Sequence, residues 1–318
     1  MHTRRLICGV SLVVLLASLA APAGAWRIVY QIPRFSGGLA RVWVDGQWGY
    51  IDHGGRMAIT PQFEHASDFA EGRAVVFVNR AWQYIDPSGR VTLAGPFGPQ
   101  EPGPFAEGLA AVWDGQRYGY IDAAGTWVIA PRFELAEPFS DGLALVRLRS
   151  RWAFINRLGR VVRRPKVRTA MGFADGRAPV ELGEDRWGYI DRAGELVIAP
   201  HFEAARQFSE GLAAVKRHGQ WGYIDLTGTL VLPGPFEAAG AFVTGLAPVT
   251  MDGRWGYVDR GGRLVIQPQF VWAGAFSEDL AAVCVEAATA RIGGTYGYIN
   301  PLGQVAIAPR LRPCTLMR

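Results

Sequence analysis

A phenylalanine that recurs at nearly constant intervals constrains the fold more than any local motif in this chain. It opens eight units, and the steps between successive units are 34, 36, 34, 34, 35, 34 and 34 residues. The eight positions are Phe35, Phe69, Phe105, Phe139, Phe173, Phe208, Phe242 and Phe276. A fixed period of this length is typical of proteins in which each repeat packs on its neighbours. We therefore expect one repeat domain over residues 26–318, rather than the two domains that length alone would suggest.

Each unit contains three short segments with strand character. In the clearest unit, Leu212–Val215 is apolar, Trp221–Asp225 is aromatic and β-branched, and Leu230–Leu232 precedes a proline. An Asp-x-x-Gly or Asn-x-x-Gly sequence between the second and third segments predicts a tight turn, because Asp and Asn bond their own backbone and Gly adopts the left-handed conformation. We interpret these acids as turn residues rather than metal ligands or catalytic carboxylates, since they recur through the repeat.

The middle of the unit resembles the WG-repeat family of bacterial proteins, which is named for a Trp-Gly pair. The pair stands in Trp48–Asp52, Trp187–Asp191, Trp221–Asp225 and Trp255–Asp259, each preceded by a Phe-x-x-Gly-Leu/Arg-Ala stretch. The resemblance covers Phe35 to about Pro309 and implies a β-rich repeat with a binding or scaffolding role and no catalytic residues. Gln83 and Ala153 replace the glycine in two units. There we expect the close backbone approach that a strand glycine permits to be absent.

The expected fold is all-β, with eight tandem units of three antiparallel strands. An open, β-solenoid-like array is favoured, because 34 residues provide only three clear strands. The alternative is an eight-bladed propeller-like ring, which the strand-like segment Trp26–Arg34 favours because it could complete the last unit. A propeller blade would need a fourth strand, and Glu203–Gln207 would have to supply it. A Pro/Gly-rich insert over residues 95–104 is expected to form a surface loop.

Residues 1–25 have the pattern of a secretory signal peptide. Arg4 and Arg5 precede the apolar run Leu6–Ala20, and Ala23–Ala25 offers small residues for cleavage. The run is short for a membrane span, and no later segment is apolar enough to cross a bilayer. We expect cleavage after Ala25 and export to the periplasm or the extracellular space, as a protein that does not span the membrane.

Export would place two cysteines in an oxidising compartment. Cys284 lies in the first strand of the last unit and Cys314 lies in the C-terminal tail. A disulfide between them would fix the tail to the last repeat. Two unpaired cysteines are the alternative, because the sequence does not show whether the two Cα atoms are close enough for a bridge.

The fourth unit carries a local excess of positive charge. Residues 147–168 contain nine Lys or Arg and no acid. The candidate anion-binding side chains are Arg151, Arg160, Arg163, Arg164, Lys166 and Arg168. Arginine binds phosphate and carboxylate bidentately, so the candidate ligands are anionic lipid headgroups, lipopolysaccharide and acidic glycans, with nucleic acid not expected. The alternative is a solvated charged face, since strand alternation can point neighbouring side chains in opposite directions.

No sequence motif indicates catalysis, a metal site or a cofactor. The histidines His53, His65, His201 and His218 occupy unrelated positions of the repeat, and we expect them to be surface or structural residues. The first functional hypothesis is an exported, non-catalytic binding or scaffolding protein of the bacterial cell envelope that holds a protein or peptide. A lectin-like or polyanion-binding module on the fourth unit is the second. A hydrolase with carboxylates from different repeats is the third.

Overall fold

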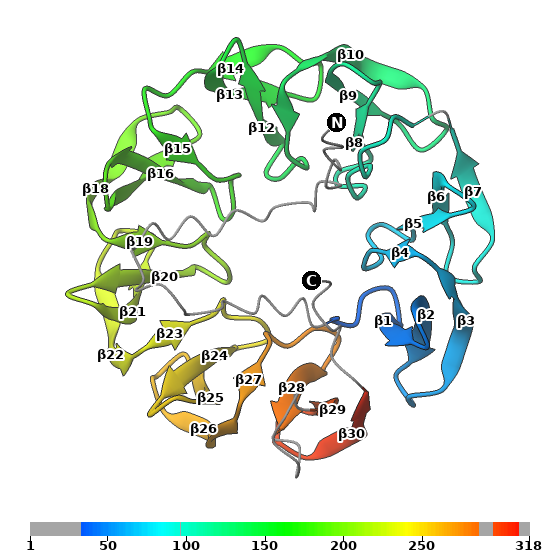
Figure 1. Ribbon diagram of the computed structural model, residues 1–318. Coiled ribbons are helices and arrows are strands. Elements are labelled where there is room, and N and C mark those ends of the chain that lie inside the picture. Colours follow the sequence, from blue (N-terminus) through cyan, green and yellow to red (C-terminus); the bar gives the residue numbers. More distant parts are fainter. Residues whose placement is uncertain (1–32, 96, 286–294, 312–318) are drawn as a thin grey trace, which may run out of the picture.

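The described chain is an eight-bladed β-propeller. The computed structural model describes residues 33–95, 97–285 and 295–311, which form strands and turns and contain no helix. Eight small antiparallel sheets stand around a ring (Figure 1). This is the closed ring that the sequence left as the alternative, and the open array is not formed.

The blades are numbered one to eight in chain order, and within each the strands follow one another from the centre of the ring outward (Figure 1). Blades one and three have three strands. Blade one consists of β1 (Leu39–Val44), β2 (Gln47–Asp52) and β3 (Met57–Phe63). Blade three consists of β8 (Ala110–Trp113), β9 (Tyr118–Ile121) and β10 (Trp127–Phe133). Blade two consists of β4 (His65–Ala66), β5 (Ala74–Val78), β6 (Ala81–Ile85) and β7 (Val91–Ala94). Blade four consists of β11 (Leu135–Ala136), β12 (Leu143–Leu148), β13 (Arg151–Asn156) and β14 (Val161–Arg163).

The remaining four blades each have four strands. Blades five and six are β15 (Thr169–Ala170), β16 (Arg177–Gly183), β17 (Arg186–Asp191) and β18 (Leu196–Phe202), and β19 (Ala204–Ala205), β20 (Leu212–Arg217), β21 (Gln220–Asp225) and β22 (Leu230–Phe236). Blades seven and eight are β23 (Ala238–Ala239), β24 (Leu246–Met251), β25 (Arg254–Asp259) and β26 (Leu264–Phe270), and β27 (Trp272–Ala273), β28 (Ala281–Val285), β29 (Thr295–Ile299) and β30 (Val305–Leu311).

The innermost strand lies in the segment that was expected to supply a fourth strand, which is Glu203–Gln207 in blade six. In blade six this is β19, where Ala204 pairs with Lys216 and Ala205 with Val215. Such a strand has only two residues, so it is too short to produce a recognisable alternation in the sequence. This is why three strands per unit were expected where six of the sheets have four.

The glycine of the Trp-Gly pair allows the outermost strand to cross closely over its neighbour. A Cβ added to Gly256 would lie 2.5 Å from the carbonyl oxygen of Ile266. The six units that have this glycine all have outermost strands of seven residues. Where Gln83 and Ala153 replace it, the outermost strands β7 and β14 have four and three residues. These shorter outermost strands agree with the expected absence of the close approach in the two units.

The turns that lead into the outermost strands are built as the sequence predicted. Asp225 Oδ1 accepts hydrogen bonds from the backbone N of Thr227 at 2.9 Å and of Thr229 at 3.0 Å. The Thr227 hydroxyl also donates to it and is the largest cause that lowers the pKa of this carboxyl. Gly228 closes the turn with a positive φ of 88°. The recurring acids are therefore committed to their own turns.

The hydrophobic core lies between adjacent blades. One cluster joins Leu212, Tyr223 and Phe236 of blade six to Phe242 and Val249 of the next unit. In every blade except blade four, which has Phe154 instead, a tyrosine of the strand next to the outermost one crosses to the next unit, as where Tyr223 Oη donates to the Gly240 carbonyl at 2.9 Å. Equivalent bonds are made by Tyr50, Tyr84, Tyr120, Tyr189, Tyr257 and Tyr298. Burial raises the pKa of the Tyr223 hydroxyl, so it stays protonated as a donor.

The last blade is joined to the first by the same kinds of hydrogen bond that join the other neighbouring blades. Tyr298 Oη donates to the Pro33 carbonyl at 3.0 Å, and Glu278 Oε2 accepts from the backbone N of Gly38 at 3.0 Å. The second bond is equivalent to the one that Glu210 accepts from Gly245 between blades six and seven. The ring is therefore closed by the repeat itself. Most of the segment Trp26–Arg34, which was expected to complete the last unit of a ring, lies outside the described residues.

Candidate functional site

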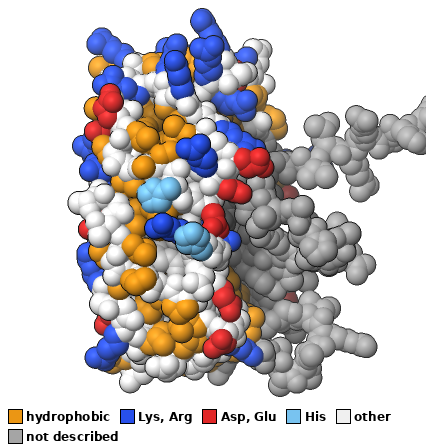
Figure 2. All heavy atoms as spheres, turned by 90° about the vertical axis from the view of Figure 1, so that its left-hand side faces the viewer, with side chains coloured by type: hydrophobic (Ala, Val, Ile, Leu, Met, Phe, Trp, Pro, Cys, Tyr) orange, Lys and Arg blue, Asp and Glu red, His pale blue; other side chains and the backbone are white. Residues whose placement is uncertain are grey.

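The predicted anion-binding residues run from blade four to the start of blade five, where Arg168 lies, and the fold separates them. Blade four lies in the upper part of Figure 1, and Figure 2 shows Lys and Arg side chains standing out from that edge of the ring. Arg151 begins β13, next to the hairpin that joins β12 to β13. Arg160 follows the turn at the other end of β13, a strand of six residues that spans about 20 Å. The six residues therefore do not form one compact pocket.

Arg163 is used to join two blades. It pairs with Phe154, as Ile59 pairs with Tyr50 and Ile198 with Tyr189, so it occupies a position that holds a buried isoleucine in blades one and five. Its Nε donates to the backbone carbonyl of Ala193 in blade five. This arginine has a structural partner and is a weaker ligand candidate than the sequence indicated.

Arg168 stands where other blades have a glutamate. Its backbone N bonds to the carbonyl of Glu181, as that of Glu203 bonds to Lys216 in blade six. Glu203 there accepts from the backbone N of Gly219 at 3.1 Å. In blade five the Arg168 guanidinium instead lies 3.7 Å from the Glu181 carboxylate. The exchange removes one acid from the start of blade five, next to blade four, and adds a cation there.

Arg160 has also lost the acid of its turn. The equivalent arginines of blades one and two, Arg56 and Arg90, lie 3.3 Å and 3.8 Å from the carboxylates of Asp52 and Asp86. Asn156 takes the aspartate position in blade four and accepts from the backbone N of Arg160 at 3.0 Å. Within residues 33–95, 97–285 and 295–311, no ion pair is recorded for the exposed side chains Arg151, Arg160, Arg164 and Lys166. One repeat acid is thus replaced by Asn156 in blade four, and another is replaced by Arg168 at the start of blade five.

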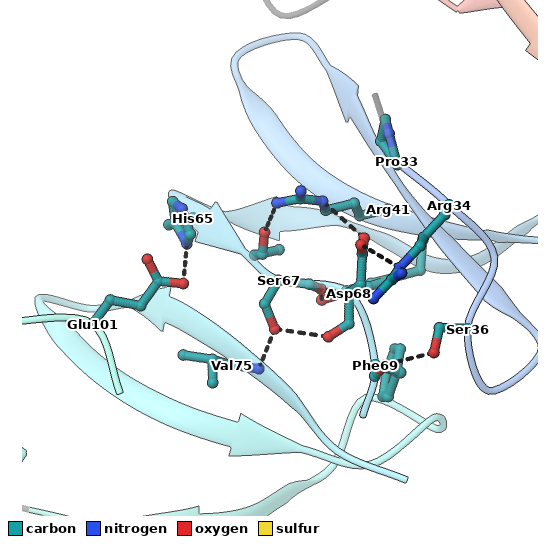
Figure 3. Close-up of polar contacts among 12 residues, drawn as sticks. Pro33, Arg34, Ser36, Arg41, His65, Ser67, Asp68, Phe69, Val75 and Glu101 are labelled. Atoms are coloured by element: carbon teal, nitrogen blue, oxygen red, sulfur yellow. Dashed lines mark hydrogen bonds and ion pairs between the residues drawn. The ribbon is translucent and has the colours of Figure 1, made fainter. Parts of the chain in front are cut away.

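A second polar group, which sequence reasoning missed, lies between blades one and two (Figure 3). Arg41 is 8% exposed, and its Nε lies 3.1 Å from Asp68 Oδ1 while its Nη1 donates to the Ala66 carbonyl at 2.6 Å. Arg34 lies 3.5 Å from the other oxygen of Asp68. Arg41 pairs with Tyr50 as Val75 pairs with Tyr84 in blade two. A charged residue at a repeat position that is otherwise small and apolar was the available signal.

Glu101 approaches His65 from the next blade because of a two-residue insertion (Figure 3). The backbone N–H groups of Gly98 and Gly103 donate to the carbonyls of Trp113 and Ala111, so the two donors are five residues apart. The equivalent donors of blade four, Glu134 and Glu137, are three residues apart. The insertion accounts for the step of 36 residues between Phe69 and Phe105. It places Glu101 Oε1 at 3.7 Å from His65 Nδ1, with 16% of the Glu101 side chain exposed. This part of the expected surface loop is therefore partly buried.

Burial displaces the pKa values of this pair in opposite directions. It raises the pKa of Glu101 to about 7 and lowers that of His65 to about 4, and the Arg41 charge lowers both. Burial also raises the pKa of Glu137. The pKa of Tyr118 is raised mainly by burial and to a lesser extent by the charges of Glu137 and Glu101. Groups with displaced pKa values often gather at binding or catalytic sites. The expectation that the protein is not an enzyme therefore stays a prediction.

The pair makes stability depend on pH with two opposing slopes. Glu101 binds its proton more tightly when folded, so its contribution falls as pH rises from about 4.5 to about 7. His65 binds its proton less tightly when folded, so its contribution falls as pH drops from about 6.5 to about 4. Relative to wild type, Glu101→Gln should gain up to about 3 kcal/mol across the Glu101 window. Urea unfolding at several pH values measures it, and a constant difference between variant and wild type would contradict the raised pKa.

The other predicted sites are only partly covered by the described residues. Cys284 is buried and unpaired there, and Cys314 lies outside them, so the disulfide between the two stays a prediction. In the part of the chain that the structure describes, no three His, Cys, Asp or Glu side chains group as metal ligands. The same part contains no helix long and apolar enough to cross a membrane.

Comparison with solved structures identifies the fold. BamB from Moraxella catarrhalis has a TM-score of 0.52 and 10% identity over 80% of this chain and 92% of that one. A eukaryotic initiation factor has a TM-score of 0.58 and 9% identity, with 90% and 89% covered. The dihydro-heme d1 dehydrogenase NirN in complex with DHE has a TM-score of 0.56 and 12% identity, with 89% and 76% covered. At these identities the likeness shows the propeller fold alone.

Comparison of the sequence identifies the repeat. No curated protein matches the chain. The family model described as "WG containing repeat" matches residues 48–82, 118–152, 152–184, 187–221, 221–255 and 255–287. These segments make up more than half of the 318 residues. The chain belongs to the WG-repeat family.

Proposed function

We propose that this protein is an exported, non-catalytic binding scaffold of the bacterial cell envelope, and that it holds a protein or peptide on the outer wall of its ring. Membership of a repeat family supports a binding or scaffolding role. The closed propeller supports it further, because it presents eight similar blade edges to the surroundings.

The observation that carries the proposal is a belt of exposed apolar side chains on the outermost strands. In blade six, Leu230 and Val231 are 46% and 41% exposed. The apolar belt consists of Met57, Val91, Trp127, Val128, Val161, Leu196, Val197, Leu230, Val231, Val265 and Val305. Figure 2 shows hydrophobic side chains following one another along the outer wall. Exposed apolar surface that is continuous over several elements is characteristic of interaction sites.

Prolines limit how a partner can bind to this wall. Pro61, Pro131 and Pro200 lie within β3, β10 and β18, three or four residues after the exposed pairs. Proline has no backbone N–H to offer an added strand. We therefore expect a partner to be held by side-chain contacts with the belt rather than by extension of a sheet.

Export is tested by the N-terminus of the mature protein. Residues 1–32 lie outside the described residues, so the expectation rests on their sequence. Expressed with its native start in a bacterial host, the protein should reach the periplasm or medium with Trp26 as its first residue. Intact mass and N-terminal sequencing measure this, and Ala25→Asp should leave the precursor uncleaved. Full-length protein that stays in the cytoplasm would refute export.

Binding on the wall is tested by site-specific crosslinking in cells. A photoreactive residue at Val197 or Val231 should give one adduct of discrete mass, whereas the same residue at the exposed hairpin position His218 of blade six should not. Val231→Asp should abolish the adduct formed at Val197 if one partner covers both. Equal labelling at His218, or none on the belt, would remove the proposal.

A second function, anion binding at blade four, is favoured by two acid replacements, one in that blade and one at the start of blade five. Asn156 and Arg168 take the places of repeat carboxylates, and Arg151, Arg160, Arg164 and Lys166 are exposed around them.

A further inference from the structure

The turn of blade four combines an exposed apolar side chain with exposed cations. Leu158 is 70% exposed between Arg157 and Arg160, which are both exposed. Its backbone N bonds to Asn156 Oδ1 at 3.1 Å, so the turn that presents it is well ordered. Val161 follows at 38% exposure. A large aliphatic residue held outward on a fixed turn contributes nothing to the core of the ring and is available to another surface.

The other blades separate these two features. Leu302 of blade eight is 76% exposed on the equivalent turn, but its neighbours are Pro301 and Gln304. Arg56 and Arg90 occupy the equivalent turns of blades one and two and pair with the aspartates of those turns. Among the turns that the structure describes, only that of blade four has the exposed leucine, the arginines and the asparagine together.

The positive charge continues from this turn along the outside of the blade. Arg164 and Lys166 are exposed, while Pro165 between them is half-buried, so the two cations face outward. Figure 2 shows Lys and Arg side chains projecting from the upper edge of the ring, with hydrophobic side chains among them. Glu134 and Glu181 pair with Arg147 and Arg168 at the two ends of the stretch. The edge between them keeps its charge.

We propose that blade four docks the ring edge-on to a lipid surface that carries anionic headgroups. Arg160, Arg164 and Lys166 would meet lipid phosphates, and Leu158 would enter the boundary between headgroups and acyl chains. Each cation near an anionic surface adds to the attraction, and an apolar side chain adds the transfer of its own surface out of water. A soluble polyanion would use the cations and leave Leu158 in water, so the leucine favours a membrane. This inference does not depend on the protein partner of the apolar belt.

The test is sedimentation of the mature chain, residues 26–318, with two kinds of vesicle. One kind is phosphatidylcholine alone, and the other is phosphatidylcholine with an equal part of phosphatidylglycerol. Binding should occur only to the second kind and should weaken as salt is raised, because screening shortens the reach of the charges. The triple variant Arg160→Gln, Arg164→Gln, Lys166→Gln should bind about 100-fold more weakly. Arg163 is left unchanged because it joins blades four and five.

Matched variants separate a membrane from other anions and from damage to the fold. Leu158→Asp should weaken vesicle binding about tenfold or more, whereas Leu302→Asp and Arg90→Gln should bind as wild type does. All variants should keep the wild-type unfolding midpoint, since the altered side chains are exposed. Equal binding to both vesicles would overturn the proposal. So would full binding by Leu158→Asp, above all if dextran sulfate competed with the vesicles, because the site would then bind soluble polyanions.

Discussion

Gly256→Val should destabilise the ring by about 3 kcal/mol, which is a large effect for one substitution. A Cβ at this position would lie 2.5 Å from the Ile266 carbonyl oxygen and 2.7 Å from the Pro268 nitrogen. Both are backbone atoms, so the crossing strand β26 would have to move as a whole. Urea unfolding of the mature chain, followed by tryptophan fluorescence, measures the loss.

The chain contains its own control for this substitution. Ala153 stands at the same place in blade four, where β14 has only three residues and makes no such crossing. Ala153→Gly should cost no more than about 1 kcal/mol, which is the conformational cost of a glycine within a strand. If Gly256→Val unfolds at the wild-type urea concentration, the close approach does not contribute to stability.

Asp68→Ala should destabilise the protein by about 3 kcal/mol, because it removes the carboxylate 3.1 Å from the buried Arg41 Nε. Loss of one partner from a buried ion pair is costlier than loss of both, since the remaining charge has been taken out of water. The double variant Arg41→Val, Asp68→Ala should therefore recover most of the stability. Valine is chosen because Val75 holds the equivalent position in blade two.

The same variants show whether the Arg41–Asp68 pair is structural. Thermal and urea unfolding of both variants and of Arg41→Val alone give a double-mutant cycle. If Asp68→Ala costs no more than an exposed ion pair, which is below about 1 kcal/mol, the pair does not stabilise the contact between blades one and two. A double variant no more stable than Asp68→Ala alone would mean that the cost lies in Arg41 packing.

The sequence predicts those parts of the fold that each repeat determines by itself. The eight units, the turn aspartates such as Asp225 and the crossing at Gly256 follow from local chemistry and are confirmed. The choice between an open array and a ring does not follow in this way. It depends on whether Glu278 and Gly38, at opposite ends of the array, come together.

The candidate sites were less predictable because they depend on departures from the repeat. The charge of blade four was visible in the sequence, but the division of its arginines between structural and exposed positions was not. Arg163 takes a buried aliphatic position and Arg168 takes that of a glutamate, and only the strand register shows this. Glu101 and His65 meet because an insertion in one blade reaches the next, which a search for motifs within single units does not detect.

Closure also affects how the chain reaches and leaves its folded state. Glu278 and Gly38 are 240 residues apart, whereas the equivalent pair Glu107 and Gly142 is separated by 35. The longer separation adds only about 2 kcal/mol of loop entropy, because this cost grows with the logarithm of length. Closure is the slow, non-local step, and blades can first associate with their neighbours. Once closed, the ring has no terminal blade to fray, so unfolding must begin by breaking an interface that is flanked on both sides.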